Sequence, residues 1–317
     1  MTVAVILLAY AAGVGTLGAR MLARAGWTAR APLLAIVTYL AAAWSVVAAF
    51  GLAGLTLAVH ATALGGALSQ LIGACVLRLR ATYATPGGMS AAEAGLVLSG
   101  AVLIRTAAIA AGQLRAAGRQ ALRHAQAARL VGRPESALDA VLVEDARPTA
   151  YCVAGRQPTV ILSTGALLAL DPLQLDAVLA HERAHLTWRH HRLLAMARIS
   201  HRALPFLPLM RDTEAQVERL VELHADDAAT RARDPRPLAA ALVVLAAACG
   251  PAPVLAAGAT DAVHRIHRLL RPAEPLGALR RQLLRALAAG LVLLPVGLAL
   301  APAILALALG RVPSSPM

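Results

Sequence analysis

Charged residues are scarce in this 317-residue sequence. They make up 15% of the chain, whereas hydrophobic residues make up 58%, and the mean hydropathy is +0.64. A typical soluble domain has about 25% charged residues, so this composition indicates several membrane spans. The formal net charge is +13, and the arginines cluster at the ends of apolar runs. That arrangement is typical of membrane topology, so we expect no direct nucleic-acid binding.

Cysteine is also scarce, and basic residues are missing from the start of the chain. Cys75, Cys152 and Cys249 are far apart and form no C-x-x-C pair. This spacing argues against a disulfide framework and a cysteine metal site, so we expect free thiols. No Lys or Arg precedes the first apolar run, 2–19, and basic residues follow it instead. A secretory signal peptide has the opposite order, so we interpret 2–19 as a true span.

Four apolar runs have the length of a membrane span: 2–19, 32–59, 92–114 and 286–310. Arg105 interrupts the third run, and we expect this charge to face the bundle interior, water or another helix. The apolar stretch 64–77 is too short to span and is predicted to be interfacial or re-entrant. The stretch 192–210 has interspersed charges and is predicted to be a membrane-surface helix and loop.

The positions of the basic residues predict an orientation in the membrane. The loop 20–31 and the region from 115 onward are the most basic, so both should be cytoplasmic. The N-terminus is then outside, 1–114 forms a three-span region, 115–285 is a cytoplasmic domain, and 311–317 is a short tail outside. Three arginines spaced four apart after the third run suggest a nucleic-acid patch or a juxtamembrane helix on anionic lipid, and we favour the lipid. These are Arg115, Arg119 and Arg123.

The cytoplasmic domain begins with segments of strand character at Leu138–Glu144, Ala150–Val153 and Thr159–Leu162. A helix should follow from the N-cap Asp171, with Pro172 at its first position and Gln174 as the reciprocal capping partner, and it should end near Trp188. Further helices are predicted at Asp212–Thr230, Leu238–Cys249 and 261–270. We therefore expect a mainly α membrane protein with four transmembrane helices and an α+β domain inserted between spans three and four; the resemblance described below implies that this domain is a zincin-like (gluzincin) peptidase domain.

The helix that starts at Asp171 contains the motif H-E-x-x-H at His181–His185. Residues four apart share a helix face, so both imidazoles can reach one metal ion. Glu182 lies one step round the helix, where a general base could take a proton from metal-bound water. The alternative is an ordinary amphipathic helix with unconnected histidines.

A second helix supplies an acidic stripe, formed by Glu214, Glu218, Glu222 and Asp226. Like charges at this spacing are mildly unfavourable and need a cationic partner. A zinc ion with its histidines is one candidate, and Arg211 and Arg219 on a solvated face are the other. Catalytic zinc takes three protein ligands, so we predict one Zn²⁺ held by His181, His185 and Glu222. Asp226 would orient a ligand histidine through its other ring nitrogen.

Other polar residues of the domain are weaker candidates for this site. Tyr151, His224 and His264 are candidates for stabilising the oxyanion or contacting the substrate. His190 and His191 lie just beyond the first helix and could be ligands, although a basic helix C-terminus is the plainer interpretation.

Four segments in this order resemble the BlaR/MecR-type membrane zinc metallopeptidases, gluzincins that form the peptidase part of beta-lactam-sensing receptors. The segments are Ala150–Gly155, Ile161–Gly165, Ala177–His185 and Glu222–Ala229. The resemblance implies that His181, His185 and Glu222 bind zinc, that Glu182 is the general base, and that the protein lies in a bacterial cell membrane. It also implies that a substrate strand adds to the sheet edge, at Ala150–Val153 or Thr159–Leu162. The sequence ends at Met317, so we expect no extracellular sensor domain.

The resemblance implies an integral-membrane zinc metalloendopeptidase that acts on a protein or peptide, by analogy a winged-helix repressor. Two alternatives stay open at this point. One is an HtpX-like quality-control protease that degrades misfolded membrane proteins. The other is a non-catalytic membrane scaffold or receptor with a structural zinc site. The sequence does not predict the oligomeric state.

Overall fold

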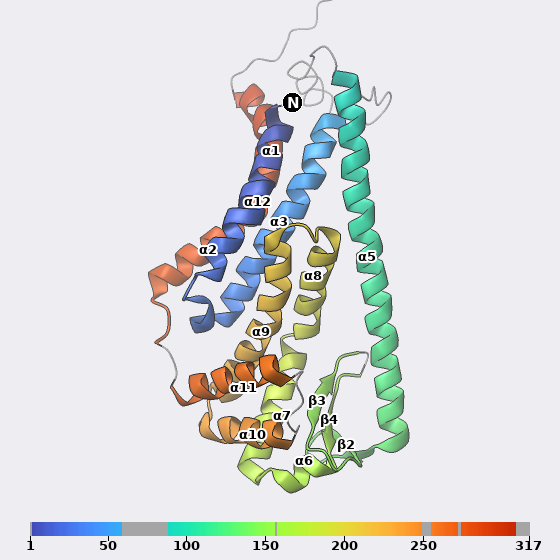
Figure 1. Ribbon diagram of the computed structural model, residues 1–317, viewed down its shortest axis with the longest axis vertical. Coiled ribbons are helices and arrows are strands. Elements are labelled where there is room, and N and C mark those ends of the chain that lie inside the picture. Colours follow the sequence, from blue (N-terminus) through green and yellow to red (C-terminus); the bar gives the residue numbers. More distant parts are fainter. Residues whose placement is uncertain (1, 59–87, 156, 249–254, 272–273, 309–317) are drawn as a thin grey trace, which may run out of the picture.

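The computed structural model describes residues 2–58, 88–155, 157–248, 255–271 and 274–308. The predicted interfacial stretch 64–77, the tail 311–317 and the residues Cys75 and Cys249 lie outside these ranges. The described chain forms a bundle of long helices with a small sheet and shorter helices at one end (Figure 1).

The four predicted apolar runs are all helical. The first is α1 (Thr2–Gly13), continued by a π-helical turn, η1 (Val14–Gly18), and by α2 (Ala19–Ala23); a short turn, η2 (Thr28–Arg30), follows it. The others are α3 (Pro32–Ala58), α5 (Gly88–Val131) and α12 (Ala278–Ala308). Each of the four is long and apolar enough to cross a membrane. The start of α1 and the end of α12 lie at the end of the molecule opposite the sheet (Figure 1).

Helix α5 is longer than predicted. We expected the third span at 92–114 and a juxtamembrane helix after it, and in the structure both belong to one continuous helix of 44 residues. Its second half is rich in Ala, Leu, Arg and Gln, which are strong helix formers, so nothing in the sequence ends the helix there. At 1.5 Å per residue it measures roughly 66 Å, about twice the thickness of a bilayer core. The half that carries Arg115, Arg119 and Arg123 therefore extends beyond the apolar half toward the sheet.

Helices α3 and α5 cross at small residues. A Cβ atom placed on Gly54 would lie 2.0 Å from Cβ of Ser99, and one on Gly95 would lie 2.5 Å from Cβ of Leu57. The hydroxyl of Ser99 donates to the carbonyl of Gly51 at 2.7 Å. Small residues with a hydroxyl that bonds the facing backbone are the usual means of close helix packing in membranes. The two glycines therefore set the distance between these helices.

The small sheet contains the three predicted strands and one more. Its strands are β1 (Arg133–Glu135), β2 (Ala140–Val143), β3 (Ala150–Val153) and β4 (Thr159–Ser163), in the order β1-β2-β4-β3. Strand β1 was not predicted because it is short, polar and exposed. Strand β4 is parallel to β2 and antiparallel to β3, so both of its edges are paired. Of the two segments expected at a sheet edge, Thr159–Leu162 was the wrong choice and Ala150–Val153 is the edge.

Shorter helices follow this sheet along the chain. They are α6 (Thr164–Ala169), α7 (Pro172–Thr187), α8 (His190–Ala203), α9 (Pro208–Thr230), α10 (Arg236–Ala248) and α11 (Leu255–Leu270). The predicted capping box starts α7, because Asp171 accepts from two backbone N–H groups and Gln174 accepts from the Asp171 N–H. Leu179 of α7 packs on the sheet against Ala140 and Val160. This contact fixes the helix that carries H-E-x-x-H.

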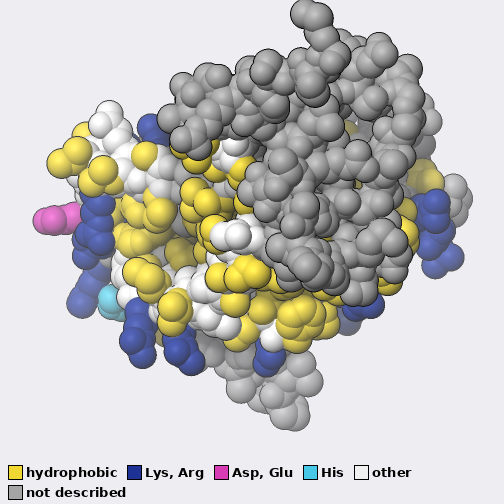
Figure 2. Space-filling model, turned by 90° about the horizontal axis from the view of Figure 1, so that it is seen from above, with side chains coloured by type: hydrophobic (Ala, Val, Ile, Leu, Met, Phe, Trp, Pro, Cys, Tyr) yellow, Lys and Arg dark blue, Asp and Glu magenta, His cyan; other side chains and the backbone are white. Residues whose placement is uncertain are grey.

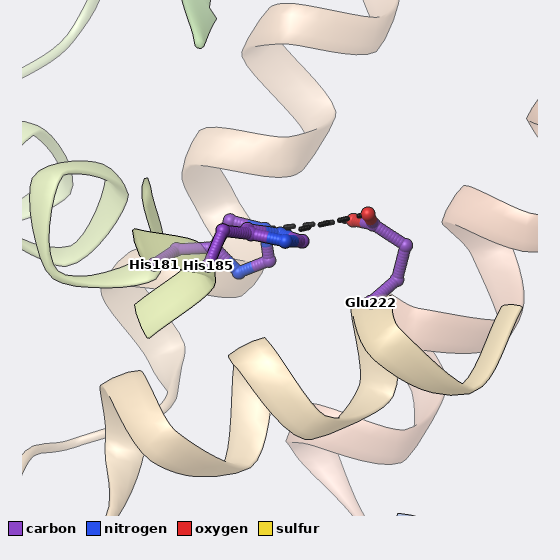
Figure 3. A group of neighbouring side chains, drawn as sticks. All are labelled: His181, His185 and Glu222. Carbon is purple, nitrogen blue, oxygen red and sulfur yellow. Dashed lines mark hydrogen bonds and ion pairs between the residues drawn. The ribbon is translucent and has the colours of Figure 1, made fainter. Parts of the chain in front are cut away.

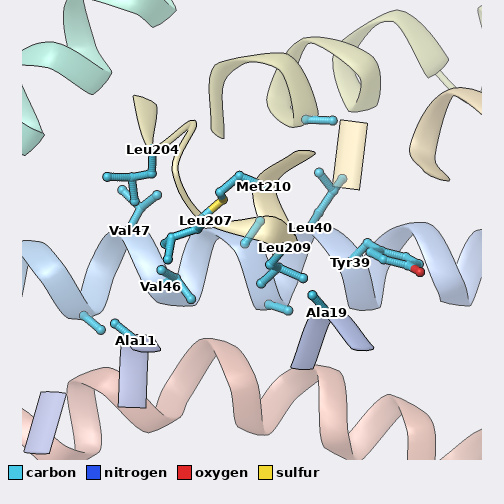
Figure 4. Packing of buried hydrophobic residues seen from close by; sticks show 14 of the residues in the cluster. Ala11, Ala19, Tyr39, Leu40, Val46, Val47, Leu204, Leu207, Leu209 and Met210 are labelled. Carbon is cyan, nitrogen blue, oxygen red and sulfur yellow. The ribbon is translucent and has the colours of Figure 1, made fainter. Parts of the chain in front are cut away.

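The region 192–210 forms a helix and a loop as predicted, and only one side of it is buried: Ala197, Ile199 and Ala203 are buried, whereas Met196 and Phe206 are exposed. Its position at a membrane surface stays a prediction. Helices α8 and α9 form a hairpin whose tip contributes Leu204, Leu207, Leu209 and Met210 to a core shared with α3. Figure 4 shows these side chains against Val46 and Val47 of α3. Two of the basic residues that suggested a surface, Arg198 and His201, pair with Glu218 and Glu214 of α9.

Arg105, in the third apolar helix, links α5 to this hairpin. Its Nε donates to the carbonyl of Ala203 at 3.1 Å and its Nη2 to the carbonyl of Arg202 at 2.9 Å. These are carbonyls at the C-terminal end of α8, which have no partner within their own helix. The expectation that this charge meets another helix is confirmed.

The surface of the bundle is apolar over large areas. Large side chains of α5 and α12 are exposed, among them Val97 (71%) and Leu293 (67%). Seen from above, hydrophobic side chains dominate the visible described surface and basic ones lie toward its margin (Figure 2). Exposed apolar area on this scale suits a lipid environment.

Candidate metal centre

The three predicted ligands meet between α7 and α9. The two ring nitrogens His181 Nε2 and His185 Nε2 lie 3.1 Å apart. The Glu222 carboxylate reaches both, with Oε2 3.5 Å from His181 Nε2 and Oε1 3.5 Å from His185 Nε2. Figure 3 shows the two rings and the carboxylate pointing toward one another. The group could hold one metal ion.

These separations fit zinc. Tetrahedral zinc with bonds of about 2.0–2.1 Å holds its ligand atoms about 3.3 Å apart. The two His–Glu contacts of 3.5 Å and the His–His contact of 3.1 Å lie close to that value. When both nitrogens present lone pairs, a cation between them removes their mutual repulsion. The donor set and its spacing therefore suit a metal ion.

Asp226, which we predicted to orient a ligand histidine, lies next to His181. Its Oδ1 lies 3.0 Å from His181 Nδ1, on the side of the ring that faces away from Glu222. Asp226 is one helical turn beyond Glu222 on α9 and is fully buried. A carboxylate in this position keeps the proton on Nδ1 and leaves the Nε2 lone pair free for a metal.

Arg265 of α11 belongs to the site, and our sequence analysis missed it. Its Nε and Nη2 reach the two carboxylate oxygens of Asp226 at 2.8 and 2.7 Å, and its Nη1 lies 3.0 Å from Glu222. Its Nη2 is also 3.5 Å from His181 Nε2. The acidic stripe needed a cationic partner and 261–270 was a basic helix, so charge balance was the available signal. We named the adjacent His264 instead.

The acidic stripe has two kinds of partner. Glu222 and Asp226 face Arg265 and the histidines, as described above. Nearer the N-terminus of α9, Arg198 of α8 lies 3.0 Å from Glu218, and His201 lies 2.5 Å from Glu214. The partners we suggested for this part, Arg211 and Arg219, are not the ones found; Arg219 approaches Asp261 of α11 instead, at 3.8 Å.

Burial and charge shift the pKa values of the ligands in opposite directions. Burial opposes ionisation of Glu222, but His181 and Arg265 outweigh it and lower the pKa to about 2. Burial lowers the pKa of His181, but Asp226 and Glu222 outweigh it and raise the pKa to about 9. Burial lowers the pKa of His185 to about 4, and the positive charge at His181 adds to this effect. At neutral pH the protein therefore presents a carboxylate and a neutral His185.

Glu182 lies beside the ligands and contacts Cys152. Burial is the main cause of its raised pKa, and the negative charge of Glu222 adds to it. A hydrogen bond joins Glu182 to Cys152 of the edge strand β3, and burial together with the Glu182 charge raises the pKa of that thiol to about 12. Cys152 is a free, protonated thiol that can only act as a donor or a neutral neighbour at neutral pH.

The three weaker candidates lie away from the ligand atoms. Tyr151 alternates with Cys152 along β3, so its side chain is on the sheet face opposite α7. His264 is 3.4 Å from Arg219 and exposed. His224 is buried against His190 and the ring of Trp188. No described contact joins any of the three to the ligand nitrogens or to Glu222.

The comparisons with known proteins agree with this geometry. The model of Peptidase family M48 matches residues 113–216. This part of the chain contains H-E-x-x-H and resembles a domain of a zinc metallopeptidase family that includes the BlaR and HtpX types, which indicates a protease. The match ends before Glu222, so the third ligand rests on the geometry alone. Neither the curated proteins nor the solved structures contain a match to the chain.

Proposed function

We propose that this protein is an integral-membrane zinc metalloendopeptidase that cleaves peptide bonds of a protein substrate. The observation that carries the proposal is the convergence of His181, His185 and Glu222 at the ligand separations of tetrahedral zinc. The M48 match supports the reaction class, because it covers the helix that bears two of these ligands. The four apolar helices support the membrane setting.

In this proposal His181, His185 and Glu222 hold one zinc ion and Glu182 is the general base. When bound, zinc supplies a Lewis acid that polarises the scissile carbonyl and lowers the pKa of water. The Glu182 carboxylate accepts the proton of the attacking water and passes it to the leaving amine. Burial raises the pKa of Glu182, which brings the carboxylate closer to the range in which it can both accept and return a proton.

The substrate is proposed to bind as an extended strand along β3. This strand is the edge of the sheet, so one row of its backbone groups is free to pair with another chain. Cys152 of the same strand contacts Glu182, which puts the free edge next to the proposed base. The family resemblance supports the same mode of binding.

The test is the substitution Glu182→Gln in the full-length chain in detergent or lipid. Glutamine keeps the shape but cannot accept the proton, so zinc content should stay at one per chain while peptide cleavage falls by about 10²–10⁴-fold. Glu144→Gln is the matched control, because Glu144 is an exposed carboxylate of the same domain. Undiminished cleavage by Glu182→Gln would remove Glu182 from this role. Full zinc content in a wild-type chain that cleaves nothing would favour a scaffold with a structural zinc site.

The proposed orientation places both termini outside and the domain 115–285 in the cytoplasm of a bacterial cell. It is supported by the basic segments beside the helices and by the common position of the start of α1 and the end of α12 (Figure 1). Cysteine labelling with a membrane-impermeant reagent tests it. Cysteines introduced in the loop 24–31 should be protected in intact cells and labelled after lysis; labelling in intact cells would reverse the topology.

We propose regulatory cleavage of a repressor as the biological role, by analogy with the BlaR/MecR type. Comparing the proteomes of cells with wild-type and Glu182→Gln protein tests this role. One defined cut in a winged-helix DNA-binding protein supports it. Many cuts in unfolded membrane proteins would instead establish an HtpX-like quality-control protease.

A further inference from the structure

A third histidine, His190, follows H-E-x-x-H and lies next to the candidate metal centre. Helix α7 ends at Thr187, and α8 starts at His190 after only two residues. One of these, Arg189, is in the left-handed region with φ 53° and ψ 42°. This left-handed residue interrupts the helix between α7 and α8, and the His190 ring lies against the His185 ring of α7 at 4.7 Å. His190 is only 1% exposed, although it starts a helix.

His190 joins two other histidines in a chain of ring nitrogens. His185 Nδ1 lies 2.9 Å from His190 Nδ1, and His190 Nε2 lies 2.9 Å from His224 Nδ1 on α9. Both distances are those of ordinary hydrogen bonds. Each contact joins two nitrogens, so each holds one proton and has a defined donor and acceptor.

The direction of this chain follows from the ligand. His185 presents Nε2 to Glu222 and His181, and a nitrogen that binds a metal must carry a lone pair. The proton of neutral His185 is then on Nδ1 and is donated to His190 Nδ1. His190 therefore carries its own proton on Nε2 and donates it to His224 Nδ1. A proton placed on His190 Nδ1 would force His185 to carry its proton on Nε2, which would close that ligand position.

We infer that His190, held by His224, is a positioning residue that fixes the tautomer and ring orientation of the metal ligand His185. This inference rests on the proposed metal site. Ligand histidines are usually oriented by a carboxylate, a carbonyl or a water. In this protein the two ligands differ: the ionic pair of Asp226 and Arg265 orients His181, and two neutral imidazoles orient His185.

The packing holds the chain of histidines in this arrangement. The rings of His185 and His190 meet edge to face at 4.7 Å, and those of His190 and His224 at 5.1 Å. The Trp188 ring lies 4.8 Å from that of His224. Because both nitrogens of His190 are engaged by other histidines, His190 is not a fourth ligand. His190, which the sequence offered as a candidate ligand, is thus assigned to holding the second ligand, His185.

The experiment measures zinc affinity of the full-length chain by competition with a chromogenic chelator. His190→Leu removes the acceptor for His185 Nδ1–H and should weaken zinc binding by about 10–100-fold. His190→Asn keeps an acceptor, since its Oδ1 can take the place of Nδ1, and should stay within about threefold of wild type. His191→Leu is the control, because His191 is adjacent but exposed, and it should bind zinc as the wild type does.

A spectrum separates positioning from general stability. In the Co²⁺-substituted protein, His190→Leu should shift the visible absorption bands and His190→Asn should restore them, while thermal unfolding in chelator shows that each variant is folded. If His190→Leu does not fold, His224→Leu is measured instead; it leaves the contact between His185 and His190 in place and should still weaken zinc binding severalfold.

Two results would overturn the inference: wild-type zinc affinity in His190→Leu, or equal weakening in His190→Leu and His190→Asn. Failure of the metal site itself is distinguishable, because zinc binding by the wild type would then be absent or unaffected by Glu222→Gln.

Discussion

The support that Asp226 gives to His181 can be tested by Asp226→Asn, which preserves shape and removes one charge. In the wild type, Asp226 Oδ1 is 3.0 Å from His181 Nδ1 and 2.7 Å from Arg265 Nη2. Loss of an orienting group of this kind weakens metal binding about 10–100-fold, or about 1.4–2.7 kcal/mol. Arg265 already lies 3.0 Å from Glu222, and without Asp226 it competes more strongly with the metal for that carboxylate. We therefore expect the upper part of this range.

The assay is zinc competition with a chelator, combined with thermal unfolding in EDTA to show that the variant is folded. Removing one partner of a buried ion pair costs about 3–5 kcal/mol, so the metal-free variant should also unfold at a lower temperature. Asp227→Asn is the matched control, because the Asp227 side chain is 41% exposed and pairs with Arg268 outside the site. Its zinc affinity should be unchanged and its stability within about 1 kcal/mol of wild type. A folded Asp226→Asn protein with zinc affinity within twofold of wild type would refute the assigned role of Asp226.

Three further predictions concern the same site and its support. Arg265→Met leaves the buried Asp226 carboxylate and the partly exposed Glu222 carboxylate without their cation, so it should destabilise the chelated protein by about 3 kcal/mol. Saturating zinc should reduce this loss; equal losses with and without zinc would contradict the prediction. His181 has a pKa of about 9 without metal, so zinc must displace its proton below that pH. Apparent zinc affinity should rise up to about tenfold per pH unit and level off near pH 9; a profile that is flat from pH 6 to 9 would be inconsistent with it. Gly54→Leu should lower the unfolding temperature in detergent, because a Cβ there meets Ser99 at 2.0 Å, whereas Gly100→Leu, with open space at its Cβ, should not.

Local patterns were sufficient to predict much of the fold. The capping residues Asp171 and Gln174 marked the start of α7, and the apolar runs marked the long apolar helices. The spacing of His181 and His185 within one helix is set by helix geometry, so their common face followed from sequence. Glu222 could be chosen because it shares a stripe with Asp226, and the structure brings it within 3.5 Å of both histidines.

Features that depend on tertiary contacts were missed. Nothing local indicates that one side of 192–210 packs into the bundle, because its burial is decided by α3, about 150 residues earlier in the sequence. Arg265 meets Asp226 only after α11 packs against α9. It is adjacent in sequence to His264, the residue of this helix that we named. The position of β4 inside the sheet depends on strand order, which the strand signals do not encode.

Helix α9 connects the core around α3 with the candidate metal centre in one continuous helix of 23 residues. Buried hydrophobic residues of α9 from Leu209 to Leu223 belong to that core, and Glu222 lies beside the last of them. The other two proposed ligands, His181 and His185, lie on α7, which packs against the sheet. A slide of α9 by a single residue moves Glu222 about 1.5 Å, several times the ~0.2 Å tolerance of a zinc ligand. The axial position of α9 in the bundle therefore determines whether Glu222 lies within reach of the two histidines.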